Sequence, residues 1–235
     1  MKRISITLFA AIVFIAATLN ASAQNEQTRQ VSGFNGIASS GSFNVHVKID
    51  GTESLKLTAD ASIINEIETV VENGKLEIRF KKSHKWDDGN HGKIEVYVTA
   101  KSLSNLAEAG SGNINVEGAL GGDNAKIAVS GSGNVTTTVK ANDLHAVISG
   151  SGNIKLDGSS SNANIAISGS GGLKAKEFKA GSVSAVITGS GNAYIGADKT
   201  VTAHIVGSGS LVYSGQATIS DVRTVGSGRV TKANE

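Results

Sequence analysis

A short polar segment, Lys82 to Gly92, concentrates the side chains best suited to chemistry in this chain. It contains the only tryptophan of the sequence, Trp86, together with His84, Asp87, Asp88 and His91. An exposed indole is a flat platform for a sugar ring, and imidazoles and carboxylates supply hydrogen bonds beside it. The segment is therefore the leading candidate for a ligand-binding site.

The same side chains could hold a transition metal, because His84, Asp87 and His91 are suitable ligand types. Metal ligands, however, need rigid elements and partners that orient them, and the histidines lack a helical spacing. We therefore assign no metal and no cofactor to the segment. The other interpretation is a solvated hairpin tip that binds nothing.

Catalysis would need groups that the sequence does not bring together. Polysaccharide cleavage uses two carboxylates that flank the bond, or a base that abstracts a proton. The acid pair Asp87 and Asp88 would point in opposite directions on a strand, and no aligned acidic stripe appears elsewhere. We predict a protein without enzymatic activity, and a polysaccharide-active enzyme is the alternative.

The elements that must position this segment belong to a repeat. Gly-Ser-Gly triplets recur with steps of 21, 19, 19, 20, 18 and 19 residues, and their first glycines are Gly110, Gly131, Gly150, Gly169, Gly189, Gly207 and Gly226. The second glycines are Gly112, Gly133, Gly152, Gly171, Gly191, Gly209 and Gly228. A period near twenty residues predicts a solenoid, in which each coil buries its apolar face only against its neighbours. Glycine suits the corner of such a coil because it permits positive φ or close approach of the coil above.

Apolar residues alternate with polar ones on both sides of each triplet. Two places after the second glycine stand Ile114, Val135, Ile154, Leu173, Ala193, Leu211 and Val230. Alternation of this kind is typical of strands with one buried face. We predict an all-β fold, a single-chain parallel β-helix with coils of about 19 residues, the commonest repeat step.

Polar side chains recur just outside the triplets, and several are asparagines: Asn113, Asn134, Asn153 and Asn192. Equivalent amides should stack at the strand spacing of about 4.8 Å and bond from coil to coil. Such a ladder is either a structural corner or a stripe that binds glycan or ions. A calcium roll is not expected, because aspartates fall at varying offsets from the glycines.

The chain before the repeats predicts further strands, at 42–49, 54–58, 75–80 and 93–99. Residues 61–71 form the one plausible short helix, with Asp60 as its N-cap. Residues 38–43 resemble a degenerate triplet. We expect one solenoid domain over 24–235, in which 24–100 supply the cap and first coils and 101–235 the regular repeats; two packed subdomains are the alternative.

The first 23 residues have a basic start, an apolar run and the small-residue ending Ala21-Ser22-Ala23. This pattern predicts a cleaved secretory signal. Without Lys2 and Arg3 the chain has 22 − 2 = 20 basic and 20 acidic residues, so it offers no positive surface for nucleic acid. We expect no transmembrane segment after cleavage. Because the sequence has no cysteine, it forms no disulfides.

Three motifs resemble the putative auto-transporter adhesin, head GIN domain family of exported bacterial proteins. They are the opening Val31-Ser32-Gly33-Phe34-Asn35-Gly36-Ile37, the hairpin Asn73-Gly74-Lys75-Leu76-Glu77-Ile78, and the repeated Gly-Ser-Gly-Asn-Ile/Val. The resemblance covers nearly the whole mature chain, and implies a β-helical, adhesin-like fold with no established enzymatic activity. No translocator barrel follows the last triplet in this sequence, so display by self-transport is not expected.

These observations predict an exported, adhesin-like binding protein located in the periplasm, on the cell surface or outside the cell. Its solenoid faces would meet a glycan or an envelope protein. A purely structural envelope protein is a further alternative, and the sequence indicates no oligomeric state.

Overall fold

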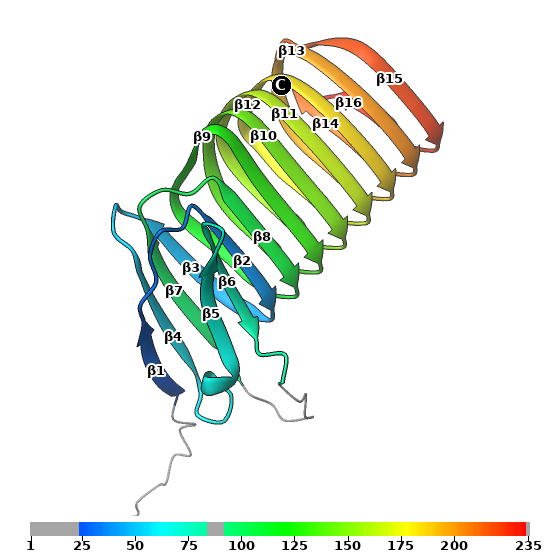
Figure 1. Ribbon diagram of the computed structural model, residues 1–235. Coiled ribbons are helices and arrows are strands. Elements are labelled where there is room, and N and C mark those ends of the chain that lie inside the picture. Colours follow the sequence, from blue (N-terminus) through cyan, green and yellow to red (C-terminus); the bar gives the residue numbers. More distant parts are fainter. Residues whose placement is uncertain (1–23, 84–91, 234–235) are drawn as a thin grey trace, which may run out of the picture.

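The chain forms a β-solenoid of about seven turns with coils of about 19 residues (Figure 1). The computed structural model describes residues 24–83 and 92–233. Its strands are β1 (Gln24–Arg29), β2 (Gly36–Gly41), β3 (Phe43–Ile49), β4 (Ser54–Asp60), β5 (Ile67–Glu72), β6 (Lys75–Phe80), β7 (Ile94–Ala100), β8 (Asn105–Gly110), β9 (Asn113–Gly131), β10 (Asn134–Gly150), β11 (Asn153–Gly169), β12 (Gly172–Gly189), β13 (Asn192–Gly207), β14 (Ser210–Ser214), β15 (Thr218–Gly226) and β16 (Arg229–Lys232).

Each triplet is a corner that divides the coil into two sides. The pre-corner side contains β2, β8, the second halves of β9 to β13, and β15, whereas the post-corner side contains β3, the first halves of β9 to β13, β14 and β16. All of these strands pair in parallel. Residues at equivalent repeat positions are in register, as for Ile148 opposite Ile167. The repeat period in the sequence is therefore the period of the coil.

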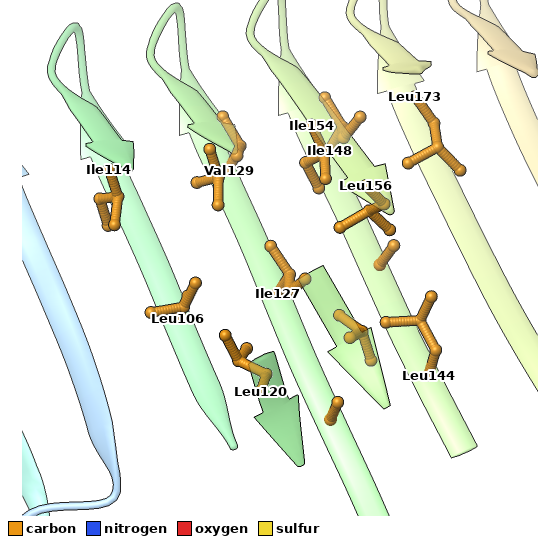
Figure 2. Packing of buried hydrophobic residues seen from close by; sticks show 14 of the residues in the cluster. Leu106, Ile114, Leu120, Ile127, Val129, Leu144, Ile148, Ile154, Leu156 and Leu173 are labelled. Atoms are coloured by element: carbon orange, nitrogen blue, oxygen red, sulfur yellow. The ribbon is translucent and has the colours of Figure 1, made fainter. Parts of the chain in front are cut away.

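The core is the narrow space between the two sides. Alternate residues of each strand point into it and fill it with apolar side chains. The positions two places after the second glycine are buried in six coils, at Ile114, Val135, Ile154, Leu173, Ala193 and Leu211. Figure 2 shows Ile114, Ile154 and Leu173 of this row, and Val129 beside its register partner Ile148 in another buried row. Each fully buried aliphatic side chain of this size contributes about 1.5–3 kcal/mol to folding, so stability accumulates coil by coil. The predicted parallel solenoid and its period are confirmed.

The two glycines of a corner differ in conformation. Gly150, a first glycine, has a φ of +116°, which L residues with side chains rarely adopt. Gly152, a second glycine, does not have positive φ, but a Cβ added there would lie 2.3 Å from the carbonyl oxygen of Gly133 in the preceding coil. The first glycine thus supplies the turn, and both glycines permit the close stacking of coils, because a Cβ on Gly150 would also lie 2.5 Å from the carbonyl oxygen of Gly131.

Strands that precede the first triplet stack on the regular coils. Gly41 is in register with Gly110, and its carbonyl oxygen accepts hydrogen bonds from the N–H groups of Ser111 and Gly112. A further coil is formed out of chain order, because β6 pairs in parallel with β2 and β7 pairs in parallel with β3. β4 and β1 then extend the post-corner side in antiparallel fashion, and β5 does so on the pre-corner side.

The helix predicted over 61–71 is not confirmed. Only a three-residue 3-10 helix, η1 (Ile64–Glu66), forms there, and Ile67–Glu72 is strand β5. Ile63, Ile64 and Ile67 are buried as an amphipathic helix would bury them, which is why the pattern was ambiguous. The deciding feature is the turn at Asn73 and Gly74, both at positive φ, which pairs the segment with β6 as a hairpin.

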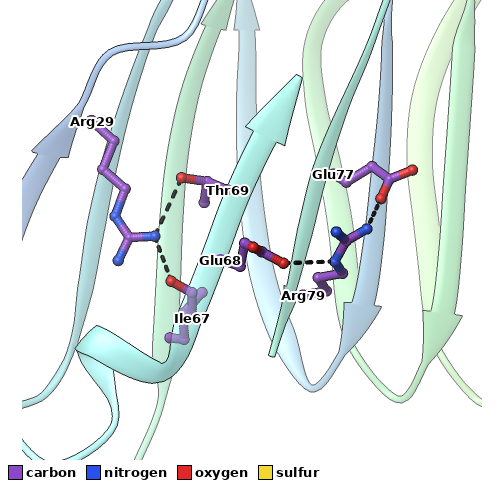
Figure 3. Close-up of polar contacts among 6 residues, drawn as sticks. All are labelled: Arg29, Ile67, Glu68, Thr69, Glu77 and Arg79. Atoms are coloured by element: carbon purple, nitrogen blue, oxygen red, sulfur yellow. Dashed lines mark hydrogen bonds and ion pairs between the residues drawn. The ribbon is translucent and has the colours of Figure 1, made fainter. Parts of the chain in front are cut away.

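Two arginine side chains link the strands at the N-terminal end of the solenoid (Figure 3). Arg29, at the end of β1, donates to the carbonyl oxygens of Ile67 at 2.6 Å and Ile64 at 2.9 Å, and so joins the post-corner side to the pre-corner side. Arg79 on β6 pairs with Glu68 on β5 at 2.9 Å and also with Glu77. The N-terminal end of the core is thereby closed.

One charged residue interrupts the apolar rows. Glu108 is 1% exposed and occupies a position that Val129 fills in the next coil. Burial raises the pKa of its carboxyl group to about 7, despite a hydrogen bond from the Gly112 N–H at 3.1 Å. The apolar surroundings disfavour the ionised form, so the Glu108 carboxyl group keeps its proton to a higher pH than an exposed glutamate does.

Replacing this carboxyl group should change how stability depends on pH. A carboxyl whose pKa rises from 4.5 to about 7 on folding binds more protons in the folded state between those values. The free energy of unfolding should therefore fall by about 3 kcal/mol as pH rises from below 4.5 to above 7. Urea unfolding of Glu108→Val at pH 4 and pH 8 should lack most of this fall. The exposed Glu117→Gln is the control and should keep it; an equal fall in Glu108→Val would contradict the assignment.

Candidate functional site

The segment with the strongest sequence indication lies outside the described residues, because His84, Trp86, Asp87, Asp88 and His91 all fall within 84–91. Its flanks are described. Residues 81–93 join β6 to β7 at the edge where, in the neighbouring coil, Ser42 alone joins β2 to β3. The Phe80 ring at the base of the segment lies 5.1 Å from the ring of Phe43. The described flanks of the segment therefore lie where the neighbouring coil has a corner, and Phe80 packs against Phe43 there.

A single row of outward side chains runs along the post-corner side, across the strands. We call it the axial row, and its members are consecutive register partners: Lys56, Tyr97, His46, Asn115, Thr136, Lys155, Lys174 and Tyr194. With about 4.8 Å per strand, the six steps from Tyr97 to Tyr194 span roughly 30 Å. The row thus places an aromatic ring near each end of an extended polar track.

The Tyr97 end of the axial row is an ordered cluster. The rings of Tyr97 and His46 are stacked with centroids 5.0 Å apart, and the Lys56 Nζ lies 5.1 Å from the Tyr97 ring centroid. His46 Nε2 is 2.7 Å from Glu95 Oε2, and Asn44 donates to the other oxygen of Glu95 at 3.0 Å. Neighbouring strands hold these groups, so their positions are fixed by register.

A groove lies over this cluster, with a volume of about 830 Å³. Tyr97 is 43% exposed within it; because His46 and Lys56 flank the two faces of the ring, its outer edge and hydroxyl group are the parts open to a ligand. The axial row forms its floor from Lys56 to Thr136, and Lys48 and Glu117 lie on its border. Such a groove can contact a sugar ring through the tyrosine edge while offering cationic, imidazole and amide groups beside it.

The Tyr194 end repeats this chemistry. A second groove of about 490 Å³ is lined by Tyr194, by Lys155, Lys174 and Lys176, and by Asp157 and Glu177. The Lys176 Nζ lies 5.5 Å from the Tyr194 ring centroid. Both ends of the row therefore combine a tyrosine with a lysine ammonium group.

The asparagine ladder lies in the adjacent row. The side-chain amide of Asn113 donates to Asn44 at 3.0 Å, Asn134 donates to Asn113 at 3.0 Å, and Asn153 donates to Asn134 at 3.1 Å. The predicted coil-to-coil bonding is confirmed for Asn113, Asn134 and Asn153, but Asn192 instead donates to the carbonyl oxygen of Ser190, because Gly172 stands between it and Asn153. Because the amides of the ladder bond to one another, it contributes to the structure, and fewer of its donors remain for a ligand. Within 24–83 and 92–233, no group of three or more metal-ligating side chains is present.

Comparison with known proteins identifies the family. The sequence model of the putative auto-transporter adhesin, head GIN domain family matches residues 33–217. The chain belongs to this family. The predicted resemblance is thus confirmed over most of the chain.

Solved structures share the head GIN domain fold. A putative adhesin from Bacteroides fragilis NCTC 9343 is 25% identical, with 91% of this chain and 98% of that one covered and a TM-score of 0.82. With the same coverage, a putative lipid binding protein from Parabacteroides distasonis ATCC 8503 is 24% identical with a TM-score of 0.73, and a putative adhesin from Parabacteroides merdae ATCC 43184 is 23% identical with a TM-score of 0.67. No curated protein matches the chain. Over the described residues, no helix of this head GIN domain has the length and hydrophobicity to span a membrane.

Sequence reasoning missed the axial row of this head GIN domain. Its members in the regular coils stand three places after the second glycine, so Asn115, Thr136 and Tyr194 could have been aligned from the repeat. Tyr97 and Lys56 could not, because β7 and β4 join the row out of chain order. The site becomes apparent only when β4, β7 and β3 lie side by side.

Proposed function

We propose that this head GIN domain is an exported, non-enzymatic binding protein that holds an extended glycan along the axial row. The observation that carries the proposal is the pairing of Tyr97 and Tyr194 in one straight row, each ring accompanied by a lysine. The adhesin names of the family and of the Bacteroides fragilis relative agree with a binding role.

The chemistry of the row favours a sugar polymer that carries some negative charge. The exposed parts of the tyrosine rings can contact the apolar face of a sugar ring, and the polar side chains between them supply hydrogen bonds. Lys155 and Lys174 lie on the row between the rings and are exposed, so they could pair with carboxylates on the ligand. A rigid row of partners also limits the entropy lost on binding.

The proposal has two further parts: the segment with Trp86 as a second binding contact, and export directed by the secretory signal at 1–23. Trp86, His84, Asp87, Asp88 and His91 would form a second contact at the corner edge, because Phe80 and Ile94 fix both flanks of the segment there. Export by the signal would deliver the domain to the periplasm, the cell surface or the medium, where envelope glycans and proteins are found.

Replacing either tyrosine should weaken glycan binding. A glycan array would select the ligand, and calorimetry would compare Tyr97→Ala and Tyr194→Ala with the unaltered mature chain. Loss of a stacked ring should weaken affinity at least fivefold, which corresponds to about 1 kcal/mol. Tyr97→Phe should bind nearly normally because the ring is kept, and Val186→Ala on the pre-corner side should have no effect.

The same measurement on Trp86→Ala separates the two contacts. If both tyrosine variants bind unchanged while Trp86→Ala binds weakly, the site lies in the 82–92 segment and the axial row is not used. If the protein bound lipid vesicles but none of the glycans on the array, the glycan proposal would be wrong.

One observation favours a second candidate function. His46 and Glu95 form a close imidazole–carboxylate pair beside Tyr97, and such a pair can act as a general base. Incubating the bound glycan with the protein and counting new chain ends would test for polysaccharide cleavage. Cleavage that disappears in His46→Gln would establish an enzyme; an intact glycan supports the binding role.

A further inference from the structure

The two ends of the solenoid are finished differently. At the N-terminal end, β1, β4, β5 and η1 cover the core, and residues such as Leu55, Leu57 and Ile63 are at most 3% exposed. At the other end, no described strand pairs with the outer edge of β15 or of β16. Repeat proteins need terminal units with a polar outer face to stay soluble. The second end has no such unit among the described strands, which leaves it open to a partner that could cover it.

The outer edge of β15 exposes apolar side chains. Ile219 is 53% exposed, Val222 is 37% exposed and Val225 is 67% exposed. Val222 continues an inward row, because its register partner in the previous coil is the fully buried Ala203. An edge strand with a free ladder of backbone groups and apolar residues is a template for pairing with another strand.

The charges on β15 indicate which strand fits. Asp221 and Arg223 flank Val222 symmetrically, and both face outward, like their partners Thr202 and His204. If a second β15 pairs antiparallel about a two-fold axis at Val222, Asp221 of each copy lies opposite Arg223 of the other. Opposite charges directly across an antiparallel pair stabilise it, and a two-fold axis forms the pair twice. Within one chain these groups are already 3.3 Å apart and partly exposed, so both can also reach across the edge.

We propose that two copies of this chain join end to end through β15, antiparallel about Val222. The pairing closes the open core and continues the pre-corner side from one copy into the other. Because the two-fold axis is perpendicular to that side, the axial rows of both copies face the same direction. The dimer would thus present two grooved tracks to one surface, which strengthens attachment through avidity.

Charge exchange tests the proposal with matched variants. Asp221→Arg makes all four facing groups positive, and Arg223→Asp makes all four negative, so each should weaken dimerisation about 10- to 100-fold. The double variant Asp221→Arg/Arg223→Asp restores opposite pairs and should dimerise again. A mixture of the two single variants should form a mixed dimer. Sedimentation of the mature chain measures all four cases, and circular dichroism confirms that each variant is folded.

The outcomes decide between a specific edge and a nonspecific one. A mature chain that stays monomeric at millimolar concentration overturns the proposal. A dimer that is unaffected by either single variant, or that the double variant fails to restore, also overturns it, because the contact would then lie elsewhere. Only loss in both single variants, with recovery in the double variant and in the mixture, supports β15 pairing.

Discussion

Gly152→Val should unfold a large part of the solenoid or lower its free energy of unfolding by at least about 3 kcal/mol. A Cβ at Gly152 would lie 2.3 Å from the carbonyl oxygen of Gly133 and 2.5 Å from the Cγ1 of Val129. One of these atoms is backbone and the other belongs to a buried side chain, so neither can move without separating two coils. The branched methyl groups of valine make the overlap worse.

Chemical denaturation followed by circular dichroism measures this effect. Ser151→Ala in the same corner is the matched control, because Ser151 is exposed and such a change costs no more than about 0.5 kcal/mol. Equal midpoints for the two variants would show that the coils do not stack as closely as Gly152 requires.

Deleting one complete coil should be tolerated, and deleting half of it should not. Removing 150–168 joins Ser149 to Gly169, and the rows close up because Ile148, Ile167 and Ile187 are successive register partners. The loss is then one coil and one interface of a stability that is roughly additive. Removing only 150–158 takes away nine residues, the corner among them, so later inward residues lose their register.

Thermal unfolding of the two deletion variants measures the difference. The 150–168 deletion should keep a cooperative transition and a β-rich spectrum, whereas the 150–158 deletion should show neither. If both variants melted alike, stability would not depend on the coil as the unit.

The regular part of the fold could be predicted because one pattern governs it throughout. Glycine spacing gave the coil, and alternation gave the buried rows from Ile114 to Leu211. Strands at 54–58 and 75–80 were also visible locally. Residues 61–71 were assigned wrongly because an apolar period near four fits both a helix and a short turn followed by a strand, and pairing with β6 decided between them.

The candidate site was less predictable, because it depends on contacts between distant parts of the chain. Tyr97 and His46 are 51 positions apart in the sequence yet stack in space. Nothing in the repeat indicates that β7 would be a neighbour of β3, since no triplet precedes β7. Glu108 was equally hidden: its position in the repeat was recognisable, but a glutamate there gives no sign of whether it is buried.

The direction of the backbone hydrogen bonds determines how the rod would respond to tension. The described chain begins in β1 at one end of the rod and finishes after β16 at the other. A pull between these ends acts along the hydrogen bonds, so the coils would separate one after another and not all at once. Each coil of about 19 residues would release roughly 60 Å of chain. Under tension the rod would therefore lengthen in small steps, and the coils that have not yet separated would keep their folded structure.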